Sequence, residues 1–402
     1  MEMITIEDIN TKDDNKLIKI FKDINISAFL DKWGPLNVIQ VYDPDINMQG
    51  ILVIDNTILG PSCGGIKISP LITPRQIFQH ARKMTLSCAL INLDLGGAAA
   101  GIRANPFEID KIKFIKSFAK RISPYVPEQY IACPDLYVGQ EEMAAFADEV
   151  GDRQGATGKP ENMDGIPYEL GVIGLGMGIA IETVIDISYS SLSLPKDISE
   201  LTIAIQGFEQ IGRTVAKFLT NKGAKIIAIC DLGCTIYDSS GIDIKKVLES
   251  HSETNEKQLL KDLMSSKSTK KLPKDDIIKV NCDIFVTTTA NSLITDENVH
   301  TFKAKCIIEG LNDPITDSAD LILHKNNVLV LPDILTTAGG AISSHAEYNR
   351  IGSESAFSLI ESQIRETTEK VIRNAVESDI SPRRIAKEIA KERILQAMEV
   401  EK

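Results

Sequence analysis

The chain has 402 residues, of which 43% are hydrophobic and 25% charged, with 26 glycines and 16 prolines. This composition excludes a disordered chain, a collagen and a small disulfide scaffold, and the length predicts two or three packed domains. The 44 basic and 56 acidic residues give a formal net charge of −12, which argues against a nucleic-acid partner or an anionic membrane surface.

Seven cysteines are scattered through apolar runs, which predicts buried, reduced thiols in a cytoplasmic protein. Cys230 and Cys234 are spaced as a loose metal pair, but no second pair is near and the five histidines are dispersed, so we expect no metal site. The acidic start of the chain is not typical of a signal peptide. The uncharged stretch from Leu170 to Ile181 is too short to span a bilayer, so we expect no membrane partner.

The first half of the chain predicts mixed strands and helices. Residues 38–41 and 50–54 are apolar runs beside turn signals, which indicates strands. Thr73 is a predicted helix N-cap, with Pro74 at the first helical position and Gln76 closing a capping box. Apolar residues at helical spacing then extend this helix toward the glycine pair at positions 96 and 97.

The middle of the chain predicts a strand–helix–strand unit. Residues 201–206 form an apolar run of strand length, residues 212–221 have helical spacing, and residues 225–230 form a second apolar run. Further strands are expected at residues 284–286, 306–309 and 328–331. Alternating strands and helices indicate a mainly parallel, doubly wound, Rossmann-like sheet. Residues 355–401 read as helical, with a break at Ser381-Pro382.

The turn after the first of these strands resembles a damaged dinucleotide motif. It reads Gly207-Phe208-Glu209-Gln210-Ile211-Gly212, where a dinucleotide-binding turn has G-x-G-x-x-G. Glu209 replaces the glycine that lets the backbone approach the pyrophosphate, and two unit charges about 4 Å apart repel by roughly 4 kcal/mol at an effective dielectric of about 20. Asp231 matches the acid that bonds a ribose 2′-hydroxyl and repels a 2′-phosphate. We therefore expect weak binding, of NAD(H) rather than NADP(H), and an empty nucleotide fold remains the equal alternative.

Segments from Gly34 to Tyr348 resemble, in one order, the motifs of the glutamate dehydrogenase family, the Glu/Leu/Phe/Val dehydrogenases. The matching segments are GPSCGGIK (60–67), MTLS (84–87), GGAAAGI (96–102), CPD (133–135), TGKP (157–160), AIQGF (204–208), EGLN (309–312) and the run at 332–348.

This resemblance implies an α/β fold of two domains with a cleft between them. Residues 1–170 would form a substrate-type and oligomerisation domain completed by residues 345–402, and residues 171–344 a Rossmann-like nucleotide domain. Family enzymes oxidise an amino acid with a nicotinamide cofactor to a 2-oxo acid and ammonia, and they are usually hexamers. The resemblance places Asp135 at the proton-shuttling acid, Ser344 at a hydroxyl beside the substrate side chain, and Asn312 in the cofactor site.

The three substrate-site lysines of the glutamate-specific members are replaced. The matching positions are Cys63, Ser87 and Ala99, and none carries an amine. Members that act on apolar amino acids also lack the first lysine. Charged hydrogen bonds contribute roughly 1.5–3 kcal/mol each, so two lost carboxylate contacts would remove about 3–6 kcal/mol of substrate binding.

Other charges and segments near these motifs also depart from the family pattern. We interpret Lys67, Lys83 and Arg103 as solvated or structural charges rather than replacements for the lost lysines. The interdomain positions that differ from the family are Tyr168, Glu169, Val172 and Ile173, and Thr337 stands where the family has asparagine in a later motif.

Three hypotheses for the function remain open. The favoured one is a catalytically degenerate family member that acts as a regulatory or ligand-binding subunit in a homo-oligomer or beside an active paralogue. The second is a working NAD-dependent amino-acid dehydrogenase with a rebuilt substrate pocket, which the retained Asp135 and Asp231 support. The third is a scaffold without any small ligand.

Overall fold

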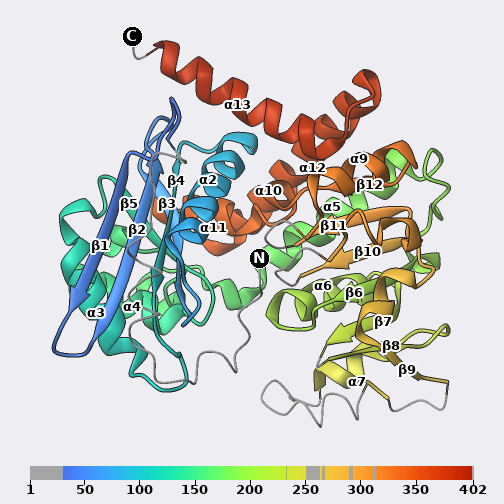
Figure 1. Cartoon of the computed structure of the whole chain (residues 1–402), viewed down its shortest axis with the longest axis horizontal. Coiled ribbons are helices and arrows are strands. Elements are labelled where there is room, and N and C mark those ends of the chain that lie inside the picture. Colours follow the sequence, from blue (N-terminus) through green and yellow to red (C-terminus); the bar gives the residue numbers. More distant parts are fainter. Residues whose placement is uncertain are drawn as a thin grey trace.

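A computed structural model describes residues 30–231, 233–249, 263–264, 268–288, 293–310 and 314–400. Two separate β-sheets, each with its own helices, form the two halves of the molecule, and the C-terminal helix α13 crosses both (Figure 1). The predicted two-domain α/β class is confirmed.

The first sheet has five strands in the order β1-β2-β4-β3-β5. Its strands are β1 (Asn37–Asp43), β2 (Met48–Asn56), β3 (Ser62–Ile68), β4 (Gly96–Ile102) and β5 (Tyr130–Pro134). Strands β3, β4 and β5 are parallel, whereas β1 and β2 join antiparallel at one edge. Helix α2 (Pro74–Leu90) covers one face, and α3 (Lys111–Ile122) and α4 (Gln140–Val150) cover the other.

Helix α2 begins as its sequence predicts and runs against the direction of the strands. The Thr73 side chain accepts a hydrogen bond from the backbone of Gln76, and the reciprocal bond completes the capping box. A Cβ added to Gly97, at the start of β4, would lie 2.1 Å from the backbone nitrogen of Thr85, whereas one added to Gly101 would meet Ile77. The early turns of α2 therefore lie over the carboxyl ends of the strands.

The second sheet has seven strands in the order β12-β11-β10-β6-β7-β8-β9. Its strands are β6 (Thr202–Gln206), β7 (Lys225–Asp231), β8 (Cys234–Tyr237), β9 (Lys270–Pro273), β10 (Ile284–Thr287), β11 (Cys306–Glu309) and β12 (Leu329–Leu331). Strands β6 and β7 are adjacent and parallel, as predicted, and α6 (Gln210–Asn221) connects them. Strands β8 and β9 extend the sheet antiparallel.

Helices lie on both faces of this sheet, as a doubly wound fold requires. Alternate strand residues pack with α5 (Val172–Ser188) and α6 on one face, and the intervening residues pack with α9 (Asp317–Lys325) on the other. The remaining helix of this half is α7 (Ile244–Glu249). Short 3-10 turns occupy Ser123–Tyr125, Arg153–Gly155, Glu161–Met163, Tyr168–Leu170, Ile198–Glu200, Lys274–Lys279 and Val299–Thr301.

One helical segment in the described part of the chain, Tyr168–Ser188, is long and apolar enough to cross a membrane by length and composition alone. The sequence expectation considered only Leu170 to Ile181 and was wrong about the length, because the helix continues past Glu182 to Ser188. The protein buries 67% of the most apolar window of this segment, where α5 packs against α6, α11 and α12. A helix in the centre of a packed domain is apolar and buried in this way.

The last helices connect the two halves. They are α10 (Asp333–Thr336), α11 (Gly339–Tyr348), α12 (Ser353–Ser378) and α13 (Pro382–Val400), with the break at Ser381-Pro382 where it was predicted. Helix α12 packs on α5, and α13 packs on α2 and β12. At its start, Arg383 pairs with buried Glu309 at 3.2 Å, and further along Arg393 pairs with Asp94 at 3.0 Å. Helix α13 therefore contacts the domain of each sheet.

All seven cysteines are buried free thiols, which confirms the expected burial. Cys230 lies near the backbone of Lys274, with its sulfur 3.6 Å from the carbonyl oxygen. Within the described ranges, no group of three His, Cys, Asp or Glu side chains is arranged to hold a metal ion.

Candidate active site

The three positions that match the family lysines are buried between the first sheet and its neighbours. Cys63, Ser87 and Ala99 are 0%, 5% and 2% exposed. The Ser87 hydroxyl donates a 2.7 Å hydrogen bond to the carbonyl of Ile334, which joins α2 directly to α10. Ala99 packs in an apolar cluster beneath α2 that includes Ile77. These positions therefore present a thiol, an already bonded hydroxyl and a methyl group.

A hydroxyl–thiol cluster of Cys63, Cys133, Thr157, Tyr168 and Ser344 occupies the region beside them. Thr157 donates to Ser344 at 2.8 Å, the Tyr168 hydroxyl lies 2.9 Å from the Ser344 hydroxyl, and the Cys133 sulfur lies 3.5 Å from it. The Tyr168 hydroxyl also donates to the backbone carbonyl of Gly340 at 2.9 Å. A hydroxyl has one donor and two acceptor positions. Since Tyr168 uses its one proton on Gly340, the single Ser344 proton is shared between Tyr168 and Cys133, and Ser344 accepts from Thr157.

Burial and mutual hydrogen bonding set the acidity of this cluster. The hydrogen bond to Cys133 and burial raise the pKa of Cys63 well above its usual value. Burial alone would raise the pKa of Cys133, but hydrogen bonds from Cys63, Thr157 and Ser344 to its sulfur lower it. Burial also raises the pKa of Tyr168 well above its usual value. None of these groups is a cation near neutral pH, so the cluster cannot neutralise a bound carboxylate.

The retained acid has an ammonium beside it. Asp135 follows β5, its side chain is 35% exposed, and its Oδ2 lies 3.2 Å from Nζ of Lys67 on β3. The Lys67 side chain is only 13% exposed, so of the two interpretations, a solvated or a structural charge, the ion pair fits the structural one. Lys83 pairs with Asp333 at 2.8 Å and connects α2 to α10. Arg103 donates to the carbonyl of Pro70 at 3.3 Å, which is a structural contact as expected.

His80 belongs to the same region, and the sequence analysis missed it. It lies on α2 one turn before Lys83, and its Nδ1 is buried without a hydrogen-bond partner. Burial and then the charge of Lys67 lower its pKa to about 3, against the opposing charges of Asp135 and Asp333. His80 is therefore a neutral imidazole whose ring responds to the charges of two ion pairs. The signal in the sequence was its spacing from Lys83 and Ser87, which places all three on one helix face.

The nucleotide-type turn has the backbone that its glycines predict. Gly207 has φ +93°, a left-handed conformation that favours glycine, and a Cβ on Gly212 would lie 2.1 Å from the Gly207 carbonyl oxygen. The Phe208 side chain is buried, and Arg213 donates to its carbonyl at 3.1 Å. The Phe208 side chain therefore cannot contact a cofactor, and the predicted place of Phe208 in the cofactor site concerns its backbone alone.

The charged residues of this turn decide how well it suits a dinucleotide. Glu209 is the exposed N-cap of α6, followed by exposed Gln210 and partly buried Ile211 in the first turn. Asp231 is the last residue of β7, and Asn312 lies outside the described residues. The turn fits a dinucleotide in its backbone, but a carboxylate stands at the helix N-terminus where the phosphates would bind.

Replacing Glu209 with glycine is expected to tighten NADH binding about tenfold or more, because the change removes the carboxylate that repels the pyrophosphate. Glu209→Gln removes the charge and keeps the side chain, so it separates repulsion from steric hindrance. Calorimetric titration measures both variants beside the unaltered protein. Tight binding by the unaltered protein, with no gain in either variant, contradicts the electrostatic argument.

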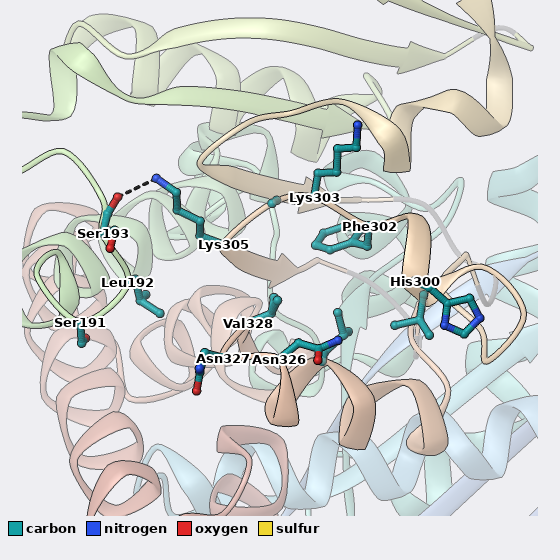
Figure 2. A pocket seen from close by; sticks show the side chains of 13 residues that line it. Ser191, Leu192, Ser193, His300, Phe302, Lys303, Lys305, Asn326, Asn327 and Val328 are labelled. Atoms are coloured by element: carbon teal, nitrogen blue, oxygen red, sulfur yellow. Dashed lines mark hydrogen bonds between the residues drawn. The ribbon is translucent and has the colours of Figure 1, made fainter.

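A separate cavity of about 480 Å³ lies in the second domain, away from these residues. Figure 2 shows Lys305 at its wall, where its ammonium donates to the Ser193 carbonyl at 2.6 Å. The same ammonium pairs with Asp283 at 2.9 Å. These contacts hold β11 against neighbouring segments, so we interpret the cavity as a structural feature rather than a site of chemistry.

Comparisons with known proteins identify the same family as the sequence motifs. Residues 165–401 match the Glutamate/Leucine/Phenylalanine/Valine dehydrogenase family, and residues 35–152 match the Glu/Leu/Phe/Val dehydrogenase dimerisation domain. A glutamate dehydrogenase of Aeropyrum pernix is 33% identical over 368 residues, which cover 86% of this chain and 84% of that protein. An NADP-specific glutamate dehydrogenase of Saccharolobus shibatae is 32% identical, over 73% of this chain and 69% of that protein.

A solved structure of the same fold covers almost the whole chain. The hetero-hexameric glutamate dehydrogenase from Thermus thermophilus, in a Leu-bound form, superposes with a TM-score of 0.81 at 22% identity, over 98% of each chain. Two matched family domains and a relative at 33% identity over most of both proteins leave one conclusion. The chain belongs to the Glu/Leu/Phe/Val dehydrogenase family.

Proposed function

We propose that this chain is a catalytically degenerate member of the family that serves as a non-catalytic subunit of an oligomer. The observation that carries the proposal is the hydroxyl–thiol cluster. Ser344, the position that the resemblance gives to substrate recognition, lies within hydrogen-bond distance of Thr157, Tyr168 and Cys133. The groups that would receive a substrate are bonded to one another.

The chemistry of the replaced positions supports the same proposal. A dicarboxylate that enters a water-poor cleft needs cations there, because its desolvation is otherwise uncompensated. Cys63, Ser87 and Ala99 supply none, and all three are buried. The charge that develops at the reacting carbon then has no preorganised partner, and the loss of one such partner typically costs about 10²–10³ in rate.

Assembly is the role that the remaining features support. A dimerisation domain matches residues 35–152, and one protein of the same fold is described as a hetero-hexameric glutamate dehydrogenase. We propose a homo-oligomer, a hexamer by resemblance, with an active paralogue as the further candidate partner. The proposal includes a cytoplasmic location, weak NAD(H) binding at most, and neither a nucleic-acid nor a membrane partner.

Light scattering on the purified protein is expected to give a mass several times the monomer's 44.1 kDa, with six copies as the family value. The reason is that the family's dimerisation domain is retained here. Co-expression with an intact, three-lysine paralogue of the same genome tests the mixed assembly. A monomer at working concentration contradicts the subunit role.

The second candidate function is an active NAD-dependent amino-acid dehydrogenase with a rebuilt pocket. The pairing of Lys67 with Asp135 favours it, because an ammonium again stands beside the acid that the resemblance gives to proton transfer. Relatives are named glutamate dehydrogenases, one NAD-specific and one NADP-specific. A dehydrogenase assay over a panel of amino and 2-oxo acids with each cofactor decides between the two functions.

A further inference from the structure

We propose that contacts between α2 and α10 form an interdomain latch, which holds the two domains at one fixed angle. The latch consists of the Lys83–Asp333 ion pair and the hydrogen bond from Ser87 to Ile334. The proposal goes beyond the proposed function, because it concerns motion between the domains rather than binding or chemistry.

The first observation is that each helix of the latch is fixed to its own sheet. On α2, Arg82 contacts the Asp55 carboxylate of β2 at 2.8 Å, and Thr85 donates to the same carboxylate at 2.6 Å. Asp55 is 0% exposed, so both contacts lie inside the first domain. Because Arg82 and Thr85 flank Lys83 in the sequence, the part of α2 that carries the latch belongs firmly to the first domain.

Helix α10 is fixed to the second sheet. It follows β12 after a single residue, Pro332, and its Thr336 hydroxyl donates to the backbone carbonyl of Glu309 at the end of β11. Thr336 and Glu309 are both 0% exposed. Helices α2 and α10 lie against each other where the two halves of the molecule meet (Figure 1). A contact from α2 to α10 is therefore a contact between the two domains.

The second observation is the geometry of the latch. Nζ of Lys83 lies 2.8 Å from Oδ2 of Asp333, and the Ser87 hydroxyl donates to the Ile334 carbonyl at 2.7 Å. The Lys83 and Asp333 side chains are 20% and 9% exposed, so salt screens this ion pair less than an exposed pair. The two contacts begin about one turn apart on α2 and end at consecutive residues of α10. They therefore oppose both separation and twisting of the two helices.

The third observation concerns the length of the side chain at position 87. Ser87 is 5% exposed, and its Oγ reaches the backbone of α10 directly, which requires a short side chain. A lysine has a four-carbon stem, which does not fit within that distance. The replacement at position 87 therefore removes a cation from the site and also allows α10 to approach α2.

Helix α13 joins the same two domains through other side chains. Arg393 pairs with Asp94 of the first domain at 3.0 Å, and Arg383 pairs with Glu309 of the second at 3.2 Å. Two bodies that are joined by one element can pivot about it, and a second connection opposes that rotation. With the latch and α13 both in place, we expect the angle between the domains to stay constant.

Double electron–electron resonance between spin labels in the two domains tests the latch on the full chain. Labels at Lys116→Cys on α3 and Lys217→Cys on α6 report the interdomain distance, and both positions are exposed. All seven native cysteines are buried, so the labels attach to the introduced ones. Dilution with unlabelled protein removes distances between subunits. The otherwise unaltered chain is expected to give one narrow distribution, which L-glutamate and NADH leave unchanged.

Two variants are expected to release the latch. Lys83→Gln combined with Ser87→Ala broadens the distribution about twofold or more, because the domains then sample other angles. Ser87→Lys shifts its maximum, because the longer side chain holds α10 away from α2. Lys305→Gln is the matched control, since it breaks an ion pair of similar length, 2.9 Å to Asp283, inside the second domain. It is expected to leave the distribution unchanged.

The measurement on the otherwise unaltered chain keeps the test independent of variant folding. A broad or two-peaked distribution in that chain, or a shift with L-glutamate and NADH, overturns the latch. A double variant that keeps the narrow distribution, or a control that broadens it equally, also overturns it. Turnover, assayed separately, tests the proposed function without bearing on these distances.

Discussion

The purified chain is expected to oxidise L-glutamate far more slowly than about 1 per second with either nicotinamide cofactor, which is the low end of the ordinary enzyme range. The positions that match the carboxylate contacts and the catalytic amine are Cys63, Ser87 and Ala99, and each is buried without a cation. The missing amine removes transition-state stabilisation, and the missing contacts remove orientation of the substrate.

Restoring lysine at these three positions is expected to recover partial turnover only if the pocket is also opened. The Tyr168 hydroxyl reaches both Ser344 and Gly340, so its ring obstructs the region that a substrate would enter. The variant that carries the three lysines and Tyr168→Gly is therefore expected to exceed the variant with the lysines alone.

The matched control adds Asp135→Asn to the opened variant, and it is expected to return the rate to background because the retained acid is then lost. A spectrophotometric assay of NADH formation measures the series. Turnover by the unaltered chain at about 1 per second or more shows that another group, with Lys67 first in line, has taken over the role of the lysine, and it refutes degeneracy.

Replacing Glu347 with alanine is expected to lower the free energy of unfolding by about 3–5 kcal/mol. This carboxylate of α11 pairs with the Lys159 ammonium, and the two side chains are only 2% and 4% exposed. It also accepts hydrogen bonds from the backbone nitrogens of Gly158 and Ile166, each at 2.7 Å. The substitution leaves a buried ammonium and two buried N–H groups without their partner, which is the costly way to break a buried pair.

Urea unfolding followed by circular dichroism measures this loss. The control is Glu388→Ala, which removes an exposed pair with Arg384 at 3.0 Å and is expected to change stability by less than about 1 kcal/mol. Equal effects of the two substitutions would show that the Glu347 contacts contribute little in solution.

The sequence was most informative where structure depends on neighbouring residues. The capping box at Thr73 and Gln76 is set within four residues, and the strand–turn–helix around Gly207 is set by apolar runs and two glycines. Family motifs then supplied the order of the two domains. Burial of the cysteines followed from the apolar runs that contain them.

The site was less predictable because its contacts join distant segments. Lys67 meets Asp135 only because β3 and β5 pair in parallel, and Tyr168 meets Ser344 across 176 positions of sequence. No local pattern encodes either contact. His80 has no distinguishing local pattern either, and the charge of Lys67 on β3 acts on its ring only in the folded chain.

Helix α13 has a consequence for the order of events during synthesis. Arg393 donates to the carbonyl of Cys88, 305 positions earlier, and Ile385 and Ile394 share an apolar core with Leu90 at the end of α2. Domains generally begin to fold as they leave the ribosome, N-terminal part first. Here the apolar end of α2 stays uncovered until α13, about 300 residues later, has been made. The nascent first domain must therefore wait, with that surface open to chaperones, for helix α13 to emerge.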